Sequence, residues 1–167
     1  MSSVDVPDRD AMHRLGSRLA SVLRAGDLVV LSGDLGAGKT TLTQGIGGGL
    51  GVRGGITSPT FVIARVHPST VGGPALVHVD AYRLSSLDEV DDLDLDTSLE
   101  DSVTVVEWGE GKVEGLAEDR LLVHVQRPVG GDGATGSDID EPRTVVLTAV
   151  GPRWDGVDLD ALLVEVA

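Results

Sequence analysis

GDLGAGKTTLTQG, at residues 33–45, is the stretch of this sequence that determines which fold we expect. Gly33, Gly38, Lys39 and Thr40 have the spacing G-x-x-x-x-G-K-[ST] of a phosphate-binding P-loop. An ordinary glycine-rich turn has no reason to place a lysine and a hydroxyl directly after its last glycine. The stretch therefore predicts a site for a nucleoside triphosphate.

The residues around this loop predict the strand–loop–helix unit in which such loops bind phosphate. An apolar run at 28–32 predicts a short buried strand, and residues 39–50 predict a helix. In such a unit, backbone N–H groups and the helix N-terminus face the phosphate oxygens, Lys39 neutralises the β- and γ-phosphates, and Thr40 offers its hydroxyl to Mg²⁺. The predicted cradle consists of Gly33, Asp34, Leu35, Gly36, Ala37, Gly38, Lys39, Thr40 and Thr41.

The predicted helix at 39–50 is unusual because its second half contains Gly45, Gly47, Gly48 and Gly49. Each glycine costs a helix up to about 1 kcal/mol relative to alanine. We therefore expect packing or a bound nucleotide to hold this half, and we predict that it is flexible.

Length and composition limit the classes of protein to consider. The 167 residues fit one domain spanning 1–167, and the absence of cysteine excludes disulfides, thiolate nucleophiles and cysteine-based zinc sites. Residues 1–10 contain no apolar run of a signal peptide, and no apolar segment reaches the roughly 20 residues of a membrane span. We expect a soluble cytoplasmic protein. The net charge of −14 disfavours direct binding to nucleic acid, because such binding relies on Lys and Arg neutralising phosphates.

The rest of the chain predicts a P-loop NTPase-like three-layer α/β fold, with a mainly parallel sheet and an antiparallel extension near the C-terminus. Apolar spacing predicts an amphipathic helix over 8–24, ended by Gly26, and a short closing helix containing Leu159, Leu162, Leu163 and Val166. With the strand at 28–32, we expect six strands, the others at 61–66, 75–79, 103–106, 121–125 and 144–150. Between the last two strands, residues 129–142 predict a mobile hairpin loop.

Two carboxylates follow apolar strands, which suggests a reaction at the phosphates. Asp80 ends the run LVHV and Glu107 ends the run VTVV, so both are placed at the carboxyl edge of the sheet, where open α/β folds bind ligands. Phosphoryl chemistry needs an acidic group there to hold the metal or its water. The hydroxyls of TSPTF, residues 57–61, are candidates to reach a γ-phosphate, its metal or the attacking water.

Other tempting sites fail on inspection. The acidic stretch from Asp92 has the aspartate spacing of a calcium loop, but Thr97 and Val103 occupy its glycine and glutamate positions. The four histidines form no H-E-x-x-H or other close ligand pair. We expect His78 to be a strand residue that packs beside Asp80.

Four segments in order, GDLGAGKTTLTQG, TSPTF, HVDAYRL and VEWGE, resemble those of the bacterial TsaE family, P-loop ATPases of tRNA threonylcarbamoyladenosine biosynthesis. The similarity covers about residues 10 to 165. It implies an enzyme that binds ATP and Mg²⁺ and hydrolyses ATP to support repeated turnover of a TsaB–TsaD complex. In this family TsaD carries out the transfer chemistry, and tRNA would be held mainly by the partners.

The resemblance also implies roles for individual residues. Its catalytic set is Lys39, Thr60, Asp80 and Glu107, its metal ligands are Thr40, Asp80 and Glu107, and its nucleotide contacts beyond the P-loop are Trp108 and Arg143. Met12 departs from the family, because relatives often have a threonine there, near the nucleotide. The segment LDLDTSLED, residues 93–101, also departs, because relatives often carry an aromatic pair there.

Three other activities compete with ATP hydrolysis as functions of a P-loop protein. The chain contains no asparagine, so a GTPase with the guanine-binding N-K-x-D motif is excluded. A small-molecule kinase and a nucleotide-dependent switch without turnover both stay open. The separate roles of Asp80 and Glu107, and the choice between monomer and dimer, are not assigned by the sequence.

Overall fold

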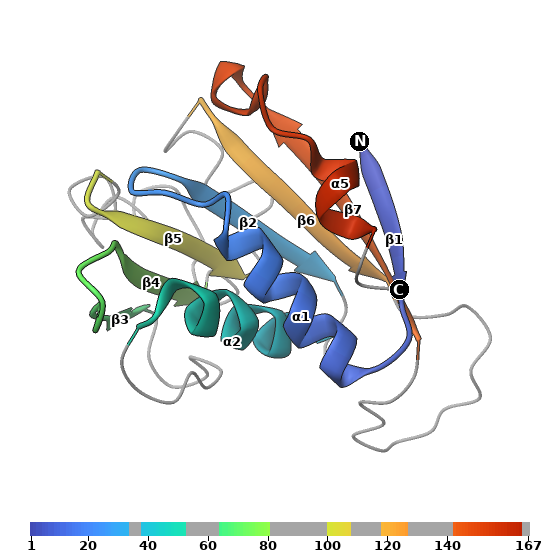
Figure 1. Ribbon diagram of the computed structural model, residues 1–167, viewed down its shortest axis with the longest axis horizontal. Helices are drawn as coiled ribbons and strands as arrows, with labels where there is room; N and C mark the ends of the chain where they lie inside the picture. Colours follow the sequence, from blue (N-terminus) through green and yellow to red (C-terminus); the bar gives the residue numbers. More distant parts are fainter. Residues whose placement is uncertain (34–37, 53–63, 81–99, 108–117, 127–141, 165–167) are drawn as a thin grey trace.

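The computed structural model describes residues 1–33, 38–52, 64–80, 100–107, 118–126 and 142–164, which are drawn in colour in Figure 1. They form one seven-stranded sheet in the order β1-β7-β6-β2-β5-β4-β3. The strands are β1 Ser2–Val6, β2 Leu28–Gly33, β3 Ala64–His67, β4 Ala75–Asp80, β5 Ser102–Glu107, β6 Arg120–Gln126 and β7 Arg143–Val150. The helices are α1 Arg9–Ala20, α2 Lys39–Leu50, the 3-10 helix η2 Pro152–Trp154, and α5 Leu159–Leu163.

The centre of the sheet is parallel and both of its edges are antiparallel. β6, β2, β5 and β4 are parallel neighbours, whereas β7 pairs antiparallel with β6, β1 pairs antiparallel with β7, and β3 pairs antiparallel with β4. The expected mainly parallel sheet with an antiparallel extension near the C-terminus is confirmed. Helices α1 and α2 lie side by side across one face (Figure 1). No helix covers the other face within the described residues, so the third layer stays a prediction.

The sequence did not predict β1, and it misplaced one end of α1. Only Val4 and Val6 of β1 are apolar, and the strand is formed by antiparallel pairing with β7, in which Val4 faces Val145. α1 begins where expected, because Asp8 caps it by accepting a hydrogen bond from the Ala11 N–H at 2.8 Å. It ends at Ala20, before the expected residue 24, and the chain turns through residues 21–27 into β2.

The remaining elements agree with the sequence where they are described. β3 begins at Ala64, so the first part of the strand expected at 61–66 lies outside the described residues. β6 and β7 are antiparallel neighbours, as a hairpin across 129–142 requires, although most of the loop lies outside the described residues. α5 closes the chain with Leu159 and Leu163 buried. None of the described helices is long and apolar enough to cross a membrane.

The glycines of α2 allow close contact between the two helices. A Cβ added at Gly45 would collide with the His13 carbonyl oxygen, and one at Gly49 would lie 2.6 Å from the Ala20 Cβ. On α1, a Cβ at Gly16 would lie 2.7 Å from the Ile46 amide nitrogen. Ser17 Oγ also donates a hydrogen bond to the Gly45 carbonyl oxygen at 3.2 Å. Packing therefore explains Gly45 and Gly49, and the flexibility of the second half of α2 stays a prediction.

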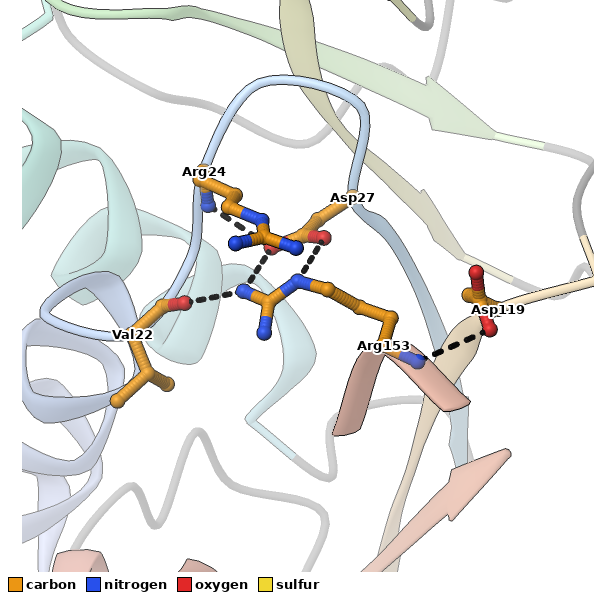
Figure 2. A network of polar contacts seen from close by, with 5 residues as sticks. All are labelled: Val22, Arg24, Asp27, Asp119 and Arg153. Carbon is orange, nitrogen blue, oxygen red and sulfur yellow. Dashed lines mark hydrogen bonds and ion pairs between the residues drawn. The ribbon is translucent and has the colours of Figure 1, made fainter. Parts of the chain in front are cut away.

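A buried ion pair holds together the amino ends of the central strands (Figure 2). Arg153 Nε and Nη2 each donate to one oxygen of Asp27 at 3.0 Å, and Nη2 also donates to the Val22 carbonyl oxygen at 2.7 Å. The Asp27 carboxylate accepts a further hydrogen bond from the Arg24 N–H, and Asp119 accepts one from the Arg153 N–H. Asp27 precedes β2 and Asp119 precedes β6, so this network connects η2 to the start of both strands.

Replacing Gly45 by alanine is expected to destabilise the protein, whereas Gly48→Ala is expected to stabilise it slightly. The new Cβ at 45 meets a backbone oxygen, whereas at the exposed Gly48 the nearest atom is His13 Cε1 at 3.8 Å. Overpacking costs about 1–3 kcal/mol, and an unhindered helical Gly→Ala change gains about 0.5–1 kcal/mol. Urea unfolding measures both. Equal free energies of unfolding for the two variants would contradict the close helix contact.

Asp27→Ala is expected to lower the free energy of unfolding by about 3–5 kcal/mol, because it leaves a largely buried guanidinium without its carboxylate. Arg65→Ala, which removes an exposed arginine of β3, is the control and should stay within about 0.5 kcal/mol of the parent protein. Guanidinium chloride unfolding followed by circular dichroism measures both variants. A similar small effect for both would show that the ion pair does not stabilise the fold.

Candidate functional site

The described ends of the predicted P-loop lie where β2 leads into α2. β2 ends at Gly33, and α2 begins at Lys39 with Gly38 as its N-cap. Lys39 is 6% exposed, and its Nζ donates a hydrogen bond to the Gly33 carbonyl oxygen at 2.8 Å. The lysine therefore folds back across the mouth of the loop. The cradle residues Asp34, Leu35, Gly36 and Ala37 lie outside the described residues.

Both glycines that bound the loop are required by local geometry. Gly33 has φ +142°, and a Cβ there would collide with the Val125 carbonyl oxygen of β6. Gly38 has φ +107°, and its Cβ would lie 3.3 Å from Cε of the buried Met12 on α1. Met12 thus lies beside the last glycine of the predicted P-loop.

The start of α2 is suited to an anion. The first N–H groups of a helix have no partner within the helix and carry a partial positive charge. The N-cap Gly38 makes no side-chain capping bond, and the first turn contains no acidic residue. Thr40 and Thr41 in this turn are half-buried. These donors, with the ammonium of Lys39, form a site in which phosphate oxygens fit well.

A buried carboxylate ends the neighbouring strand. Glu107, the last residue of β5, is 4% exposed and is in register with Leu31 of β2, two residues before Gly33. It lies on the sheet face that α1 and α2 cover, because side chains alternate along a strand and Val105 belongs to the core on that face. Asp80, the last residue of β4, is paired with Glu107, although only its backbone is described. The two acidic positions therefore meet at the carboxyl edge, as the sequence predicts.

His78 contacts Glu107, which the sequence did not predict. Its ring is fully buried on β4, and Nε2 lies 3.4 Å from Glu107 Oε2. This distance fits an ion pair but exceeds that of a good hydrogen bond, and neither ring nitrogen makes a hydrogen bond to the described residues. The strand position of His78 is as expected. The contact arises because β4 and β5 are parallel neighbours. A local sequence pattern does not show which strands are neighbours.

Arg143 belongs to the same edge of the sheet. It is the first residue of β7, is 7% exposed, and donates from Nη1 to the Pro142 carbonyl oxygen at 3.4 Å. Its neighbour Thr144 pairs with Gln126, at the end of β6 that adjoins Gly33. β6 therefore separates Arg143 from the strand that leads into the P-loop.

Not every predicted site residue can be located. Thr60 and Trp108 lie outside the described residues, as does most of the acidic stretch from Asp92. Among the described residues, no group of three or more His, Asp or Glu side chains is arranged to hold a metal ion. The buried carboxylate of Glu107 and the half-buried Thr40 hydroxyl still offer the oxygen ligands that Mg²⁺ prefers.

Comparison with known proteins agrees with the resemblance seen in the sequence. A family model described as threonylcarbamoyl adenosine biosynthesis protein TsaE matches residues 6–131. A protein of Streptomyces coelicolor named tRNA threonylcarbamoyladenosine biosynthesis protein TsaE is 65% identical over 152 residues, covering 90% of this chain and 99% of that protein. The protein of the same name from Mycobacterium tuberculosis is 58% identical over 120 residues, 68% of this chain and 71% of its own length.

The fold also matches a solved structure. The crystal structure of YdiB from Bacillus subtilis superposes with a TM-score of 0.69 and 28% sequence identity, over 99% of this chain and 93% of that one. The overall fold is therefore shared with a known protein.

Proposed function

This chain belongs to the TsaE family of threonylcarbamoyl adenosine biosynthesis proteins, and we propose on that premise that it is the ATP-binding and ATP-hydrolysing component of this tRNA modification. One observation carries the proposal. A buried lysine at an uncapped helix N-terminus lies at the same sheet edge as a buried carboxylate on the adjacent parallel strand. The first supplies positive charge and N–H donors for phosphates, and the second supplies an oxygen ligand for a metal.

Each residue has a role in hydrolysis under this proposal. Lys39 and the N–H groups of residues 33–41 bind the β- and γ-phosphates, while Thr40, Asp80 and Glu107 hold Mg²⁺. The metal, when bound, neutralises charge that develops on the phosphate oxygens. Thr60 orients a water whose oxygen bonds to the γ-phosphorus as the bond to the bridging oxygen breaks, releasing ADP and phosphate. Trp108 and Arg143 contact the nucleotide.

The charge of the chain supports an indirect relation to tRNA. With a net charge of −14, the protein is poorly suited to bind RNA by itself, because RNA binding draws on neutralisation of its phosphates. We propose that it acts in the cytoplasm as a single ATPase domain, 1–167, on homologues of TsaB and TsaD. ATP hydrolysis then supports repeated turnover of that complex, which itself holds and modifies the tRNA.

Lys39→Ala is expected to weaken ATP binding by about 10–150-fold, because charge-assisted hydrogen bonds to the phosphates are lost. Titration calorimetry of the purified protein with ATP and Mg²⁺ measures the effect. The control is Arg65→Ala, which changes the net charge by the same amount at an exposed position on β3. Unchanged binding and phosphate release in the Lys39 variant would refute the site.

The pathway is tested in cells depleted of this protein. Threonylcarbamoyladenosine in bulk tRNA, measured by mass spectrometry, should fall and should recover with the wild-type gene but not with Lys39→Ala. Unchanged modification after depletion would remove the pathway assignment and leave the P-loop intact. ADP formation stimulated by a small-molecule acceptor without matching release of inorganic phosphate, and not stimulated by the partner proteins, would indicate a kinase instead.

Glu107→Gln and Asp80→Asn separate metal binding from water activation. Each amide keeps the shape of the side chain and removes its charge, so we expect each to reduce turnover by at least about tenfold. The apparent Mg²⁺ affinity should fall with the residue that holds the metal and stay unchanged with one that acts on water. Steady-state phosphate release against Mg²⁺ concentration gives both values. Full activity in both variants would exclude this edge as the site of hydrolysis.

A further inference from the structure

The contact between His78 and Glu107 is the feature of the site that the proposed roles do not use. Along β4, Leu76 and His78 point to the same face, and His78 is in register with Val105 of β5, two residues before Glu107. His78 is 0% exposed, and buried polar groups in proteins are as a rule hydrogen-bonded. Because His78 has no other polar partner among the described residues, Glu107 is the group with which it can interact.

The neighbouring carboxylate of Glu107 is buried almost as completely as His78. The Glu107 side chain is 5% exposed, and Oε2 is the oxygen that lies 3.4 Å from His78 Nε2. A small rotation of either side chain would bring the pair to the 2.7–2.9 Å of a charge-assisted hydrogen bond, within the range that is typical for proteins. Both the Nε2–H tautomer and the imidazolium present a donor here, so the contact does not depend on which one is present.

The contact leaves the second oxygen of the Glu107 carboxylate, Oε1, available for a metal or its bound water. Oε2 is the carboxylate oxygen for which the contact with His78 Nε2 is found, and Oε1 makes no hydrogen bond to the residues that the structure describes. Carboxylates that hold metals are commonly fixed by such a hydrogen bond to one oxygen, which sets the direction of the other. We propose that His78 is a positioning residue that orients Glu107 for Mg²⁺ or its bound water; this rests on the proposed ATPase function.

A second buried histidine provides a matched control. His67 of β3 is 6% exposed and lies in register with Leu76 of β4, toward the opposite end of that strand from Asp80. Replacing His67 disturbs a buried histidine of the same sheet without touching Glu107.

The test compares two polar replacements of His78 whose side chains differ in length. The amide nitrogen of His78→Gln can occupy the place of Nε2, whereas the shorter side chain of His78→Asn cannot reach Oε2. We expect His78→Asn to lower kcat and the apparent Mg²⁺ affinity by about 10–100-fold. ATP binding without Mg²⁺ should stay within about twofold, and His78→Gln should retain most of both quantities. His67→Asn should leave both unchanged, even where it lowers the unfolding midpoint.

Combination with Glu107→Gln shows whether His78 acts through that carboxylate. In the double variant, His78→Asn should produce no further loss of kcat or Mg²⁺ affinity, because the group it positions is already changed. Equal losses for the Asn and Gln variants of His78, or additive losses in the double variant, would overturn the inference. If the wild-type protein hydrolyses no ATP even with its partners, the ATPase proposal fails. In that case, a comparison of Mg²⁺-dependent ATP binding between the wild-type protein and His78→Asn still tests the role of His78.

Discussion

The backbones of α1 and α2 lie in direct contact, and the geometry of the candidate site depends on it. Cβ atoms at Gly16, Gly45 or Gly49 would separate the helices. Their absence lets α2 lie against α1, so that Met12 reaches Gly38 at the N-terminus of α2. The position of the helix N-terminus is thus determined by a contact two turns farther along the helix. A loop that binds phosphate through backbone N–H groups needs this kind of external support, because it has few side chains of its own.

The parallel register of the central strands completes the site. Neighbouring parallel strands end at the same edge, so β2, β5 and β4 bring Gly33, Glu107 and the backbone of Asp80 to one place. Burial then determines what the carboxylate can do. A glutamate that is 4% exposed and faces a buried histidine holds a more defined direction than one in solvent. The strongly acidic surface has little influence at this depth compared with the adjacent groups.

The features that were predicted from the sequence are those that depend on local patterns of residues. β2, α2 and the P-loop residues follow from a motif that contains its own strand and helix, and the carboxylates follow from their place after apolar runs. β1 was missed because two valines give no apolar run, and its pairing partner β7 lies about 140 residues away along the chain. The glycines of α2 were interpreted as a cost to the helix that packing or a bound nucleotide offsets, but the adjacent α1 as the packing partner is not visible in a local pattern. The contact of His78 with Glu107 needs the strand order, which no single segment contains.

The Arg153 network lies at the opposite end of the same strands from the candidate site. Asp27 and Asp119 stand at the amino ends of β2 and β6, whereas the P-loop and the acidic residues stand at carboxyl ends. The stabilising network and the candidate site therefore lie at opposite edges of one sheet. Such a division allows residues at the candidate site to change without loosening the amino ends of the strands. It also gives protein engineers a rule for this scaffold: diversify the carboxyl edge and leave the amino edge unchanged.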